Sequence, residues 1–418
     1  MEEYSPRPND TEPSDRNRQW ASTMNGFTGA SEQYSGKTHQ RLSSDGDAAP
    51  GIRFAHKDSC AGVDTRAHAS HMPDNPASIA LTRPNREELE ERFLSSGATR
   101  STPGGKRTTP EEPDKWRTCF EIDRDRILHS NAFRRLAGKT QVFVFPEDHQ
   151  RTRLTHALEV AQVATAISRA CGLNVALTEA IALGHDCGHG PGGHASEDAF
   201  EPYLDGGFDH APWGANVSLS TLNLCDETLD GIRNHSWSRP APRTPEGEVV
   251  SWADRIAYVC HDWEDAVVAG VVNQNMLPKL VSERCGTRRS HQLGTFINAV
   301  TDTVIGTGRI GMDEEHAEAL SSFRTYNYEH IYLRKDSLDQ ASAVISLLRA
   351  LVDHYIENPA AIPSDDLSRS NSKLLNAGDD ANRVAVTYVA GMTDRFAFRR
   401  AIDELDWDVG ALPISATS

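Results

Sequence analysis

The residues between 183 and 197 form the densest group of potentially reactive side chains in the sequence. Three histidines and two carboxylates fall within thirteen positions, namely His185, Asp186, His189, His194 and Glu197. Four glycines and a proline stand between them, so a regular helix cannot run through the segment. Imidazoles and carboxylates bind divalent metals and exchange protons near neutral pH. The segment predicts an active site or a solvated polar loop, and a His-Asp pair at the end of an apolar helix favours the site.

A metal that activates water needs a small set of nitrogen and oxygen ligands with open positions. The imidazoles of His156 and His185, with the carboxylates of Asp186 and Asp254, would supply two of each. Such a metal would polarise a phosphoryl oxygen and lower the pKa of its bound water. We therefore expect a divalent cation, with Mg²⁺ or Mn²⁺ first, held without a thiolate.

Phosphoryl transfer also requires a proton for the leaving oxygen and positive charge around the phosphate. The candidates for these roles are His189, His194 and His210. Glu197 follows His194 by three positions, so it would lie beside that ring and could fix its tautomer if a helix starts at Ala195.

Two helices must position the first metal ligands. In residues 151–171 an apolar face repeats at intervals of four, three, four and three, and Gly172 stands where a helix would end. This face consists of His156, Val160, Val163, Ile167 and Ala170. A single histidine on an apolar face is more often a core residue than a ligand. However, the next predicted helix, 175–184, runs directly into His185, and two helices joined by a short turn pack antiparallel.

A third helix is predicted over residues 249–270, after an irregular loop over 238–248. Its apolar stripe consists of Ile256, Val259, Cys260, Trp263 and Val267. On its polar side Asp254, Tyr258 and Asp262 recur at intervals of four, so one pocket would meet all three along a line. The alternative for an acidic helix face is simple solvation.

The whole chain divides into five predicted parts. Residues 1–82 are expected to be a disordered extension, because they are polar and lack periodicity. The others are an N-terminal helical segment (83–150), a central helical region that contains the candidate site (151–270), a C-terminal helical region (271–408) and a flexible tail (409–418). In the C-terminal region the strongest amphipathic helices are 340–355 and 383–404, with a loop over 358–380 between them. Strand alternations are few, so we predict an all-α fold.

Charge and cysteine content restrict the functional class. A net charge of −17 over 418 residues disfavours a non-specific nucleic-acid binder and a protein of anionic membrane surfaces. Seven cysteines without CxxC spacing fit a reduced compartment, and Cys187 and Cys260 are expected to serve packing. Without an apolar run of about 18 residues, the protein is expected to be soluble and cytoplasmic.

Taken in order, these motifs resemble those of the HD-domain superfamily and, more narrowly, of the deoxyguanosinetriphosphate triphosphohydrolase-like family. The resemblance covers about residues 86–406. The segments that carry it are RILHSNAFRRLAGKTQ from Arg126, RLTHALEVAQ from Arg153, residues 183–197, IRNHS from Ile232, ADRIAY from Ala253 and AGMTDRFA from Ala390. The implied fold is an HD-domain helical bundle with additional C-terminal helices. In it, residues 151–270 would form the HD domain and residues 83–150 the N-terminal helical segment of the catalytic unit.

The resemblance also implies a role for individual residues. The implied metal ligands are His156, His185, Asp186 and Asp254. His194 and Glu197 match the catalytic pair, and His189 and His210 match histidines around the scissile α-phosphate. Arg153 matches an arginine on the phosphates, Tyr258 a tyrosine at the sugar C2′ side, Asp262 an acceptor for the 3′-hydroxyl, and Gln141 a residue near the base or sugar.

The implied activity is metal-dependent hydrolysis of a deoxynucleoside triphosphate (dNTP), dGTP-like, to deoxynucleoside and inorganic triphosphate. A homo-oligomer is also implied and, as in some members, a dNTP activator. The alternatives are another HD-type nucleotide phosphohydrolase, such as a nucleoside monophosphatase, and a non-catalytic dNTP-binding sensor. The sequence departs from the common family pattern at Gly190-Pro191-Gly192, where many members have Pro-Pro-Phe. We therefore expect this loop to be more flexible than theirs.

Overall fold

The structure is a computed structural model that describes residues 27–28, 65–66, 81–144, 150–363 and 381–412. The chain divides into two compact units, Met1–Ala80 and Leu81–Ser418. The described part of the first unit is a pair of short antiparallel strands, β1 (Phe27–Thr28) and β2 (Thr65–Arg66). The predicted disorder of residues 1–82 concerns positions that lie almost entirely outside the described residues, and residues 413–418 of the predicted tail lie outside them as well.

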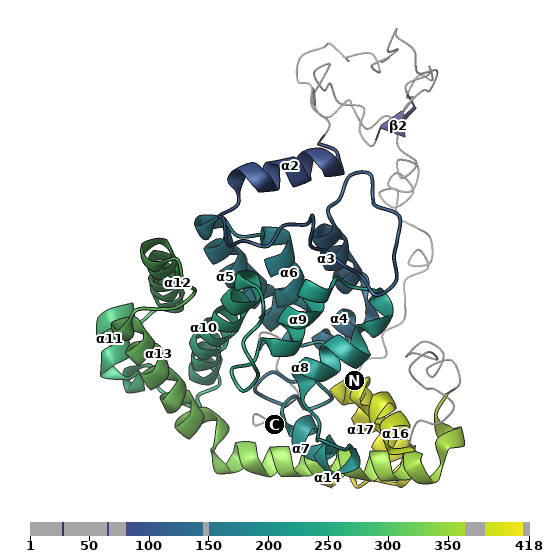
Figure 1. The fold of residues 1–418 in the computed structure, drawn as a ribbon. Coiled ribbons are helices and arrows are strands. Elements are labelled where there is room, and N and C mark those ends of the chain that lie inside the picture. The colour runs from purple at the N-terminus through teal and green to yellow at the C-terminus, as the bar shows by residue number, and fades with distance from the viewer. Residues whose placement is uncertain (1–26, 29–64, 67–80, 145–149, 364–380, 413–418) are drawn as a thin grey trace, which may run out of the picture. The chain divides into compact units, whose positions relative to one another are not determined.

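The second unit is built from helices, which confirms the all-α prediction for the described residues (Figure 1). Its α-helices are α2 (Arg83–Phe93), α3 (Cys119–His129), α4 (Asn131–Arg135), α5 (Arg153–Cys171), α6 (Val175–Gly184), α7 (Ala195–Phe200), α8 (His210–Trp213), α9 (Asp226–Asn234), α10 (Pro245–Val268), α11 (Lys279–Cys285), α12 (Arg289–Thr307), α13 (Glu314–Asn327), α14 (Lys335–Glu357), α16 (Ala381–Ala390) and α17 (Asp394–Leu405). Single 3₁₀ turns are Leu136–Gly138, Glu201–Tyr203, Ser220–Leu222, Gln274–Met276, Pro359–Ala361 and Val409–Ala411, and π turns are Gly214–Ser218 and Tyr328–Tyr332. None of the described helices is long and apolar enough to cross a membrane.

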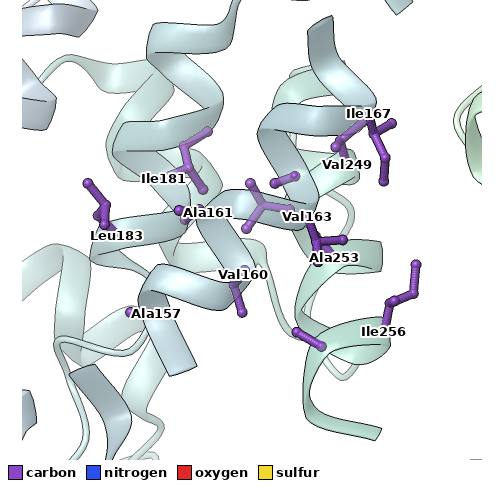
Figure 2. Packing of buried hydrophobic residues seen from close by; sticks show 14 of the residues in the cluster. Ala157, Val160, Ala161, Val163, Ile167, Ile181, Leu183, Val249, Ala253 and Ile256 are labelled. Carbon is purple, nitrogen blue, oxygen red and sulfur yellow. The ribbon is translucent and has the colours of Figure 1, made fainter. Parts of the chain in front are cut away.

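Helices α5 and α6 form the centre of the unit, as the apolar periodicity predicts. Helix α5 ends at Gly172, which adopts a left-handed conformation with φ 66°. Helix α6 begins after Asn174, whose side chain accepts a hydrogen bond from the Leu177 amide. Helix α5 packs against α6, α10 and α12. Figure 2 shows buried side chains of α5, α6 and α10, including Val163, Ile181 and Ala253, meeting in this core.

Helix α10 begins earlier than predicted. The prolines and the glycine of residues 238–248 suggested an irregular loop, but the Thr244 side chain accepts a hydrogen bond from the Gly247 amide at 3.1 Å. Pro245 follows at the first helical position, where a missing amide hydrogen costs nothing. The proline is therefore part of the helix start rather than of a loop.

The C-terminal region contains a second difference. The predicted single helix over 383–404 is two helices, α16 and α17, because Thr393 accepts a hydrogen bond from the Phe396 amide and starts a new helix. Helix α14, longer than its predicted range 340–355, runs along one side of the bundle and packs against α7, α16 and α17 (Figure 1). Most of the predicted loop 358–380 lies outside the described residues.

Replacing Ile167, which is fully buried on α5, by Ala should lower the free energy of unfolding by about 2–5 kcal/mol through lost burial and a residual cavity. The matched control is Leu158→Ala on the same helix, because Leu158 is 48% exposed and the expected change is about 0.5 kcal/mol. Denaturant titration followed by circular dichroism measures both. Equal losses would contradict the assigned core.

Candidate active site and metal centre

Three helices bring the four predicted metal ligands together. His156 lies in the first turn of α5, His185 and Asp186 directly follow α6, and Asp254 lies on α10. The His156 Nε2 atom is 3.0 Å from Asp254 Oδ1 and 3.9 Å from Asp186 Oδ2. The His185 Nε2 atom is 3.5 Å from Asp186 Oδ1 and 3.7 Å from Asp254 Oδ1. Two nitrogens and two carboxylates therefore surround one small volume.

The chemistry of this group fits a divalent cation. The buried His185 Nε2 atom has no hydrogen-bond partner among the described residues. Its Nδ1 atom lies 2.6 Å from the Ala182 carbonyl oxygen, which can only accept a hydrogen bond, so Nδ1 carries the proton. The Nε2 atom, which points toward the carboxylates, is then the one that gives up its hydrogen when a cation binds, the arrangement usual for a histidine that binds metal. His156, His185 and Asp254 offer ligand atoms within 4.8 Å of one another.

Both carboxylates are held in the ionised form that a metal ligand requires. Burial by itself would raise their pKa values, but neighbouring positive groups outweigh it. The pKa of Asp186 lies well below its ordinary value because of His185 and Arg153. The pKa of Asp254 is lowered by its hydrogen bond with His156 and by His185.

A bend rich in glycine separates the metal ligands from the next histidines. Gly192 and Gly193 have φ angles of 72° and 63°, the left-handed region. A Cβ atom at Gly193 would lie 2.6 Å from the Arg153 guanidinium. Helix α7 then begins at Ala195, the start on which the expected position of Glu197 depended. The bend lets a single segment present both His-Asp and His194 to the same site.

The three remaining histidines meet beside the metal ligands. The His189 and His210 rings stack with centroids 3.8 Å apart and an interplanar angle of 12°. The His194 ring is 4.9 Å from that of His189 and 5.8 Å from that of His210. The residues that sequence reasoning placed around a phosphate are thus brought together.

Glu197 hydrogen-bonds a different histidine from the one expected. Its Oε1 atom lies 2.5 Å from His210 Nδ1, because α8 begins at His210 and brings that ring within reach. The His194 Nδ1 atom instead lies 3.4 Å from an Arg153 nitrogen. Glu197 still offers an oxygen within 4.8 Å of ligand atoms of His189 and His194. Glu197 therefore orients His210 directly, and Arg153 is the direct neighbour of His194.

These contacts separate the protonation states of the histidines. Burial opposes a charged His210, but the hydrogen bond to Glu197 outweighs it and raises the pKa of His210. The His194 side chain is exposed to the cavity. Desolvation by the surrounding protein, followed by the positive charge of Arg153, nevertheless lowers its pKa to about 4. Burial and Arg153 also lower the pKa of His189 well below its ordinary value. Because Arg153 can only donate, a neutral His194 accepts at Nδ1 and carries its proton on Nε2.

A cavity of about 440 Å³ opens over this group. The predicted residues that line it are Gln141, Arg153, His156, Asp186, His189, His194, His210, Asp254, Tyr258 and Asp262. His185 and Glu197 lie behind this surface and contact residues that line it. Its size is that of a small-molecule site.

On the α10 side of the cavity, Asp262 is held by two residues that were not predicted from the sequence, Arg151 and Tyr332. Asp262 is buried and accepts hydrogen bonds from Arg151 and from the Tyr332 hydroxyl. Arg151 also contacts Asp265 at 2.8 Å and Glu159 at 3.0 Å. Burial raises the pKa of Asp262, although Arg151 opposes the rise. Asp262 is consequently held in place at the cavity wall.

Two arginines without a predicted role line the same cavity. The Arg324 Nε atom donates a hydrogen bond to the Tyr258 hydroxyl at 3.0 Å. The Arg255 guanidinium lies 3.4 Å from the centre of the Trp237 ring. Arg255 is adjacent to Asp254 in the sequence, which could have indicated it. The signal for Arg324 was weaker, namely its spacing of four from Tyr328 and eight from Tyr332.

The glycine-rich loop is anchored, which differs from the expected flexibility. Gly192 is buried and its amide donates to Asp394 at 2.8 Å, and the same carboxylate accepts from the Thr140 amide at 2.8 Å. The buried Lys139 ammonium donates to the carbonyl oxygens of His189 and Ala390. Burial lowers the pKa of Lys139 to about 8. Helix α17 and the Lys139 segment replace the stiffness that proline and phenylalanine would have supplied.

His235, part of a quoted motif but without a predicted role, also lines the cavity. It directly follows α9 and is buried. Its Nδ1 atom is 2.8 Å from the Ile232 carbonyl oxygen, and its Nε2 atom is 3.2 Å from His210 Nε2. Burial, with the nearby His185 and His210, lowers the pKa of His235 to about 3.

Two family models match parts of this chain. Residues 153–259 match the model of the HD domain, and residues 310–402 match that of the phosphohydrolase-associated domain. One solved structure, a phosphohydrolase from Bacteroides thetaiotaomicron, aligns at 18% identity with a TM-score of 0.42 over 67% of this chain and 69% of that chain.

Closer similarity is found among curated relatives. A deoxyguanosinetriphosphate triphosphohydrolase-like protein of Clostridium perfringens is 39% identical over 329 residues, which is 75% of this chain and 94% of the relative. A protein of the same name from Caldanaerobacter subterraneus subsp. tengcongensis is 39% identical over 318 residues, 74% of this chain and 92% of the relative. The chain thus belongs to the deoxyguanosinetriphosphate triphosphohydrolase-like family of HD-domain phosphohydrolases.

Proposed function

We propose that the protein hydrolyses dNTPs at the α-phosphorus, releasing deoxynucleoside and inorganic triphosphate. The supporting observation is that one cavity combines the histidine and aspartate cluster with Tyr258, Asp262 and the arginines Arg255 and Arg324. The cluster suits hydrolysis of a phosphoryl group, Tyr258 and Asp262 suit a sugar, and the two arginines suit further phosphates. The family membership supports the same activity.

The residues proposed to hold the divalent cation are His156, His185, Asp186 and Asp254. When bound, such a cation polarises a phosphoryl oxygen and lowers the pKa of bound water. Mg²⁺ and Mn²⁺ are the expected ions, and the two imidazoles also suit other first-row metals.

Arg153 has two proposed tasks beside the scissile bond. Its Nη1 atom contacts Asp186 at 2.8 Å, which fixes that carboxylate. Its other terminal nitrogen donates toward His194 Nδ1, which leaves the His194 hydrogen on Nε2, where it can donate a hydrogen bond to the leaving sugar oxygen. His189 and His210 are proposed to contact oxygens of the α-phosphate. The raised pKa of His210 favours a positive charge there.

The wall of the cavity explains the proposed preference for deoxyribose. Tyr258 would close the C2′ side of the sugar, so that a 2′-hydroxyl meets the ring. Asp262, held by Arg151 and Tyr332, would accept a hydrogen bond from the 3′-hydroxyl. Gln141 is proposed to approach the base or sugar. The homo-oligomer and the dNTP activator stay predictions from the family resemblance.

The purified protein, supplied with Mg²⁺ or Mn²⁺ and a dNTP, should release deoxynucleoside and triphosphate, because the attacking water would be activated at the α-phosphorus. Chromatography of the products, over four dNTPs alone and mixed, measures this. Deoxynucleoside monophosphate with pyrophosphate would refute the proposal. Preferred hydrolysis of a monophosphate would support a monophosphatase, for which Arg255 and Arg324 have no evident use. Tight binding without turnover would indicate a sensor.

Asp186→Ala should abolish turnover and lower metal content, because Asp186 borders the cation and anchors Arg153. His194→Ala should lower kcat by about 10²–10³ while the metal content stays unchanged, as expected for loss of a hydrogen-bond donor to the leaving oxygen. Elemental analysis by mass spectrometry together with steady-state kinetics separates the two roles. Full activity of the Asp186 variant would show that the ligand assignment is wrong.

Tyr258→Ala should relax the discrimination between dGTP and GTP by about tenfold or more, because the ring no longer fills the C2′ side. Tyr258→Phe is the matched control. It keeps the ring and removes only the hydroxyl that accepts from Arg324. The ratio of kcat/KM for the two substrates measures discrimination. An unchanged ratio in the Ala variant would assign the selectivity to another residue.

A further inference from the structure

We infer that Lys139 and Asp394 are positioning residues for the proposed hydrolysis. They hold the backbone of the glycine-rich loop, residues 189–194, so that the rings of His189 and His194 meet the substrate. The roles of these two rings rest on the proposed function, whereas the two anchors are residues that act without touching the substrate. Both anchors are buried, and the described wall of the cavity includes neither of them.

The first anchor is the ammonium group of Lys139. It donates hydrogen bonds to the carbonyl oxygen of His189 and, at 3.0 Å, to that of Ala390. The backbone of the same lysine reaches the start of α5, because its carbonyl oxygen accepts a hydrogen bond from the Arg153 amide at 3.3 Å. One residue thus connects the loop, the end of α16 and the helix that carries Arg153.

The second anchor is the carboxylate of Asp394, the first residue of α17. Its Oδ1 atom accepts a hydrogen bond from the Gly192 amide at 2.8 Å. Its Oδ2 atom accepts from the amide of Thr140 at 2.8 Å and from the hydroxyl of that residue at 2.5 Å. Thr140 directly follows Lys139, so both anchors join the same short segment to two different points of the loop.

The loop needs such outside contacts because three of its six residues are glycines. A glycine backbone has more conformational freedom than that of any other residue. Gly192 has a φ angle of 72°, and a Cβ atom there would lie 2.4 Å from Val344 Cγ1. A side chain therefore cannot be placed at this position to hold the loop. The His189 carbonyl oxygen and the Gly192 amide are held from outside instead.

The rings that the loop carries tolerate little displacement. The His189 ring stacks on that of His210 with centroids 3.8 Å apart, and its Nε2 atom lies 3.2 Å from Asp186 Oδ1. The His194 Nδ1 atom lies 3.4 Å from an Arg153 nitrogen. A misplacement of about 1 Å can lower a catalytic rate by about 10²-fold. A shift of the loop would therefore lower turnover although every side chain of the site is still present.

The other parts of the site are positioned independently of the loop. The proposed metal ligands lie on α5 and α10 and directly after α6, and the proposed sugar and phosphate contacts lie mainly on α10 and α13. Loss of an anchor should consequently lower kcat, while KM and the metal content stay near their wild-type values. This separation distinguishes a positioning role from a general loss of structure.

Lys139→Met tests the first anchor, because it removes the ammonium group and keeps an unbranched side chain. We expect kcat to fall by about 10–100-fold. KM should stay within about twofold of the wild-type value, as for loss of an interaction that acts in the transition state. Steady-state kinetics with Mn²⁺ and each of the four dNTPs measures both constants, and elemental analysis by mass spectrometry measures the metal content.

Arg135→Met is the matched control. The Arg135 guanidinium donates a hydrogen bond at 3.0 Å to the carbonyl oxygen of Gly391, which is next to the second acceptor of Lys139. Among the described residues it has no hydrogen bond to the loop. This variant removes a cation that holds the same turn between α16 and α17, so its kcat should stay within about twofold of wild type.

Equal losses of kcat in the two variants would overturn the inference, because they would assign the effect to the turn between α16 and α17. A folded Lys139 variant with wild-type kcat, or one that loses its metal, would overturn it as well. If circular dichroism shows that this variant is unfolded, Asp394→Asn decides by the same criteria. It keeps the size of the side chain and replaces one acceptor oxygen by a donor.

Hydrogen exchange followed by mass spectrometry supplies a readout that needs no substrate. The amides of residues 189–196 should exchange about tenfold faster in the Lys139 variant, and at the wild-type rate in the Arg135 variant. Release of other products by the wild-type chain would refute the proposed function alone, because the kcat ratios of the variants are still measurable. The proposed products, with equal kcat and equal exchange in both variants, would refute only the positioning role.

Discussion

The buried ion pair between Arg153 and Asp186 is the contact on which the rest of the site depends. The charged atoms are 2.8 Å apart, and both side chains are almost inaccessible to solvent. Removing two charges from water is costly, so either partner alone would be strongly unfavourable in this position. Arg153 opens α5 and Asp186 follows α6, so the pair also fixes how the ends of the two central helices meet. The same guanidinium contacts His194, and the backbone can approach it closely only because residue 193 is glycine.

The walls of the cavity come from parts of the chain that are distant in sequence. Helix α10 supplies Asp254, Tyr258 and Asp262, whereas Arg324 and Tyr332 come from α13 and the turn after it. The region that matches the phosphohydrolase-associated domain therefore does more than support the HD domain. It contributes the Arg324 guanidinium and the Tyr332 hydroxyl to the wall of the cavity.

The sequence predicted those helices whose apolar spacing and end signals lie within the same short segment. Helices α5 and α6 agree with the periodicity because an apolar stripe and a stop at Gly172 coincide there. The start of α10 and the break before α17 were missed, because both depend on a threonine cap that outweighs the surrounding composition. The group proposed to hold the metal could be assembled from the sequence because His185 and Asp186 are adjacent and directly follow an apolar helix. The partner of Glu197 and the role of Asp394 were not, because a turn and a contact between distant helices determine them. The predicted domain boundaries stay predictions.

The anchoring of the glycine-rich loop by Asp394 has a consequence for biosynthesis. The Asp394 carboxylate accepts a hydrogen bond from the amide of Gly192, which lies 202 positions earlier. The Lys139 ammonium donates hydrogen bonds to the carbonyl oxygens of His189 and Ala390. A chain emerging from the ribosome can pack α5 against α6 long before residue 394 has been translated. In that interval the loop between His189 and His194 lacks the contact with Asp394, and Lys139 lacks its second partner, the Ala390 carbonyl oxygen. The nascent protein should thus complete its helical core first and its catalytic geometry last, near the end of translation.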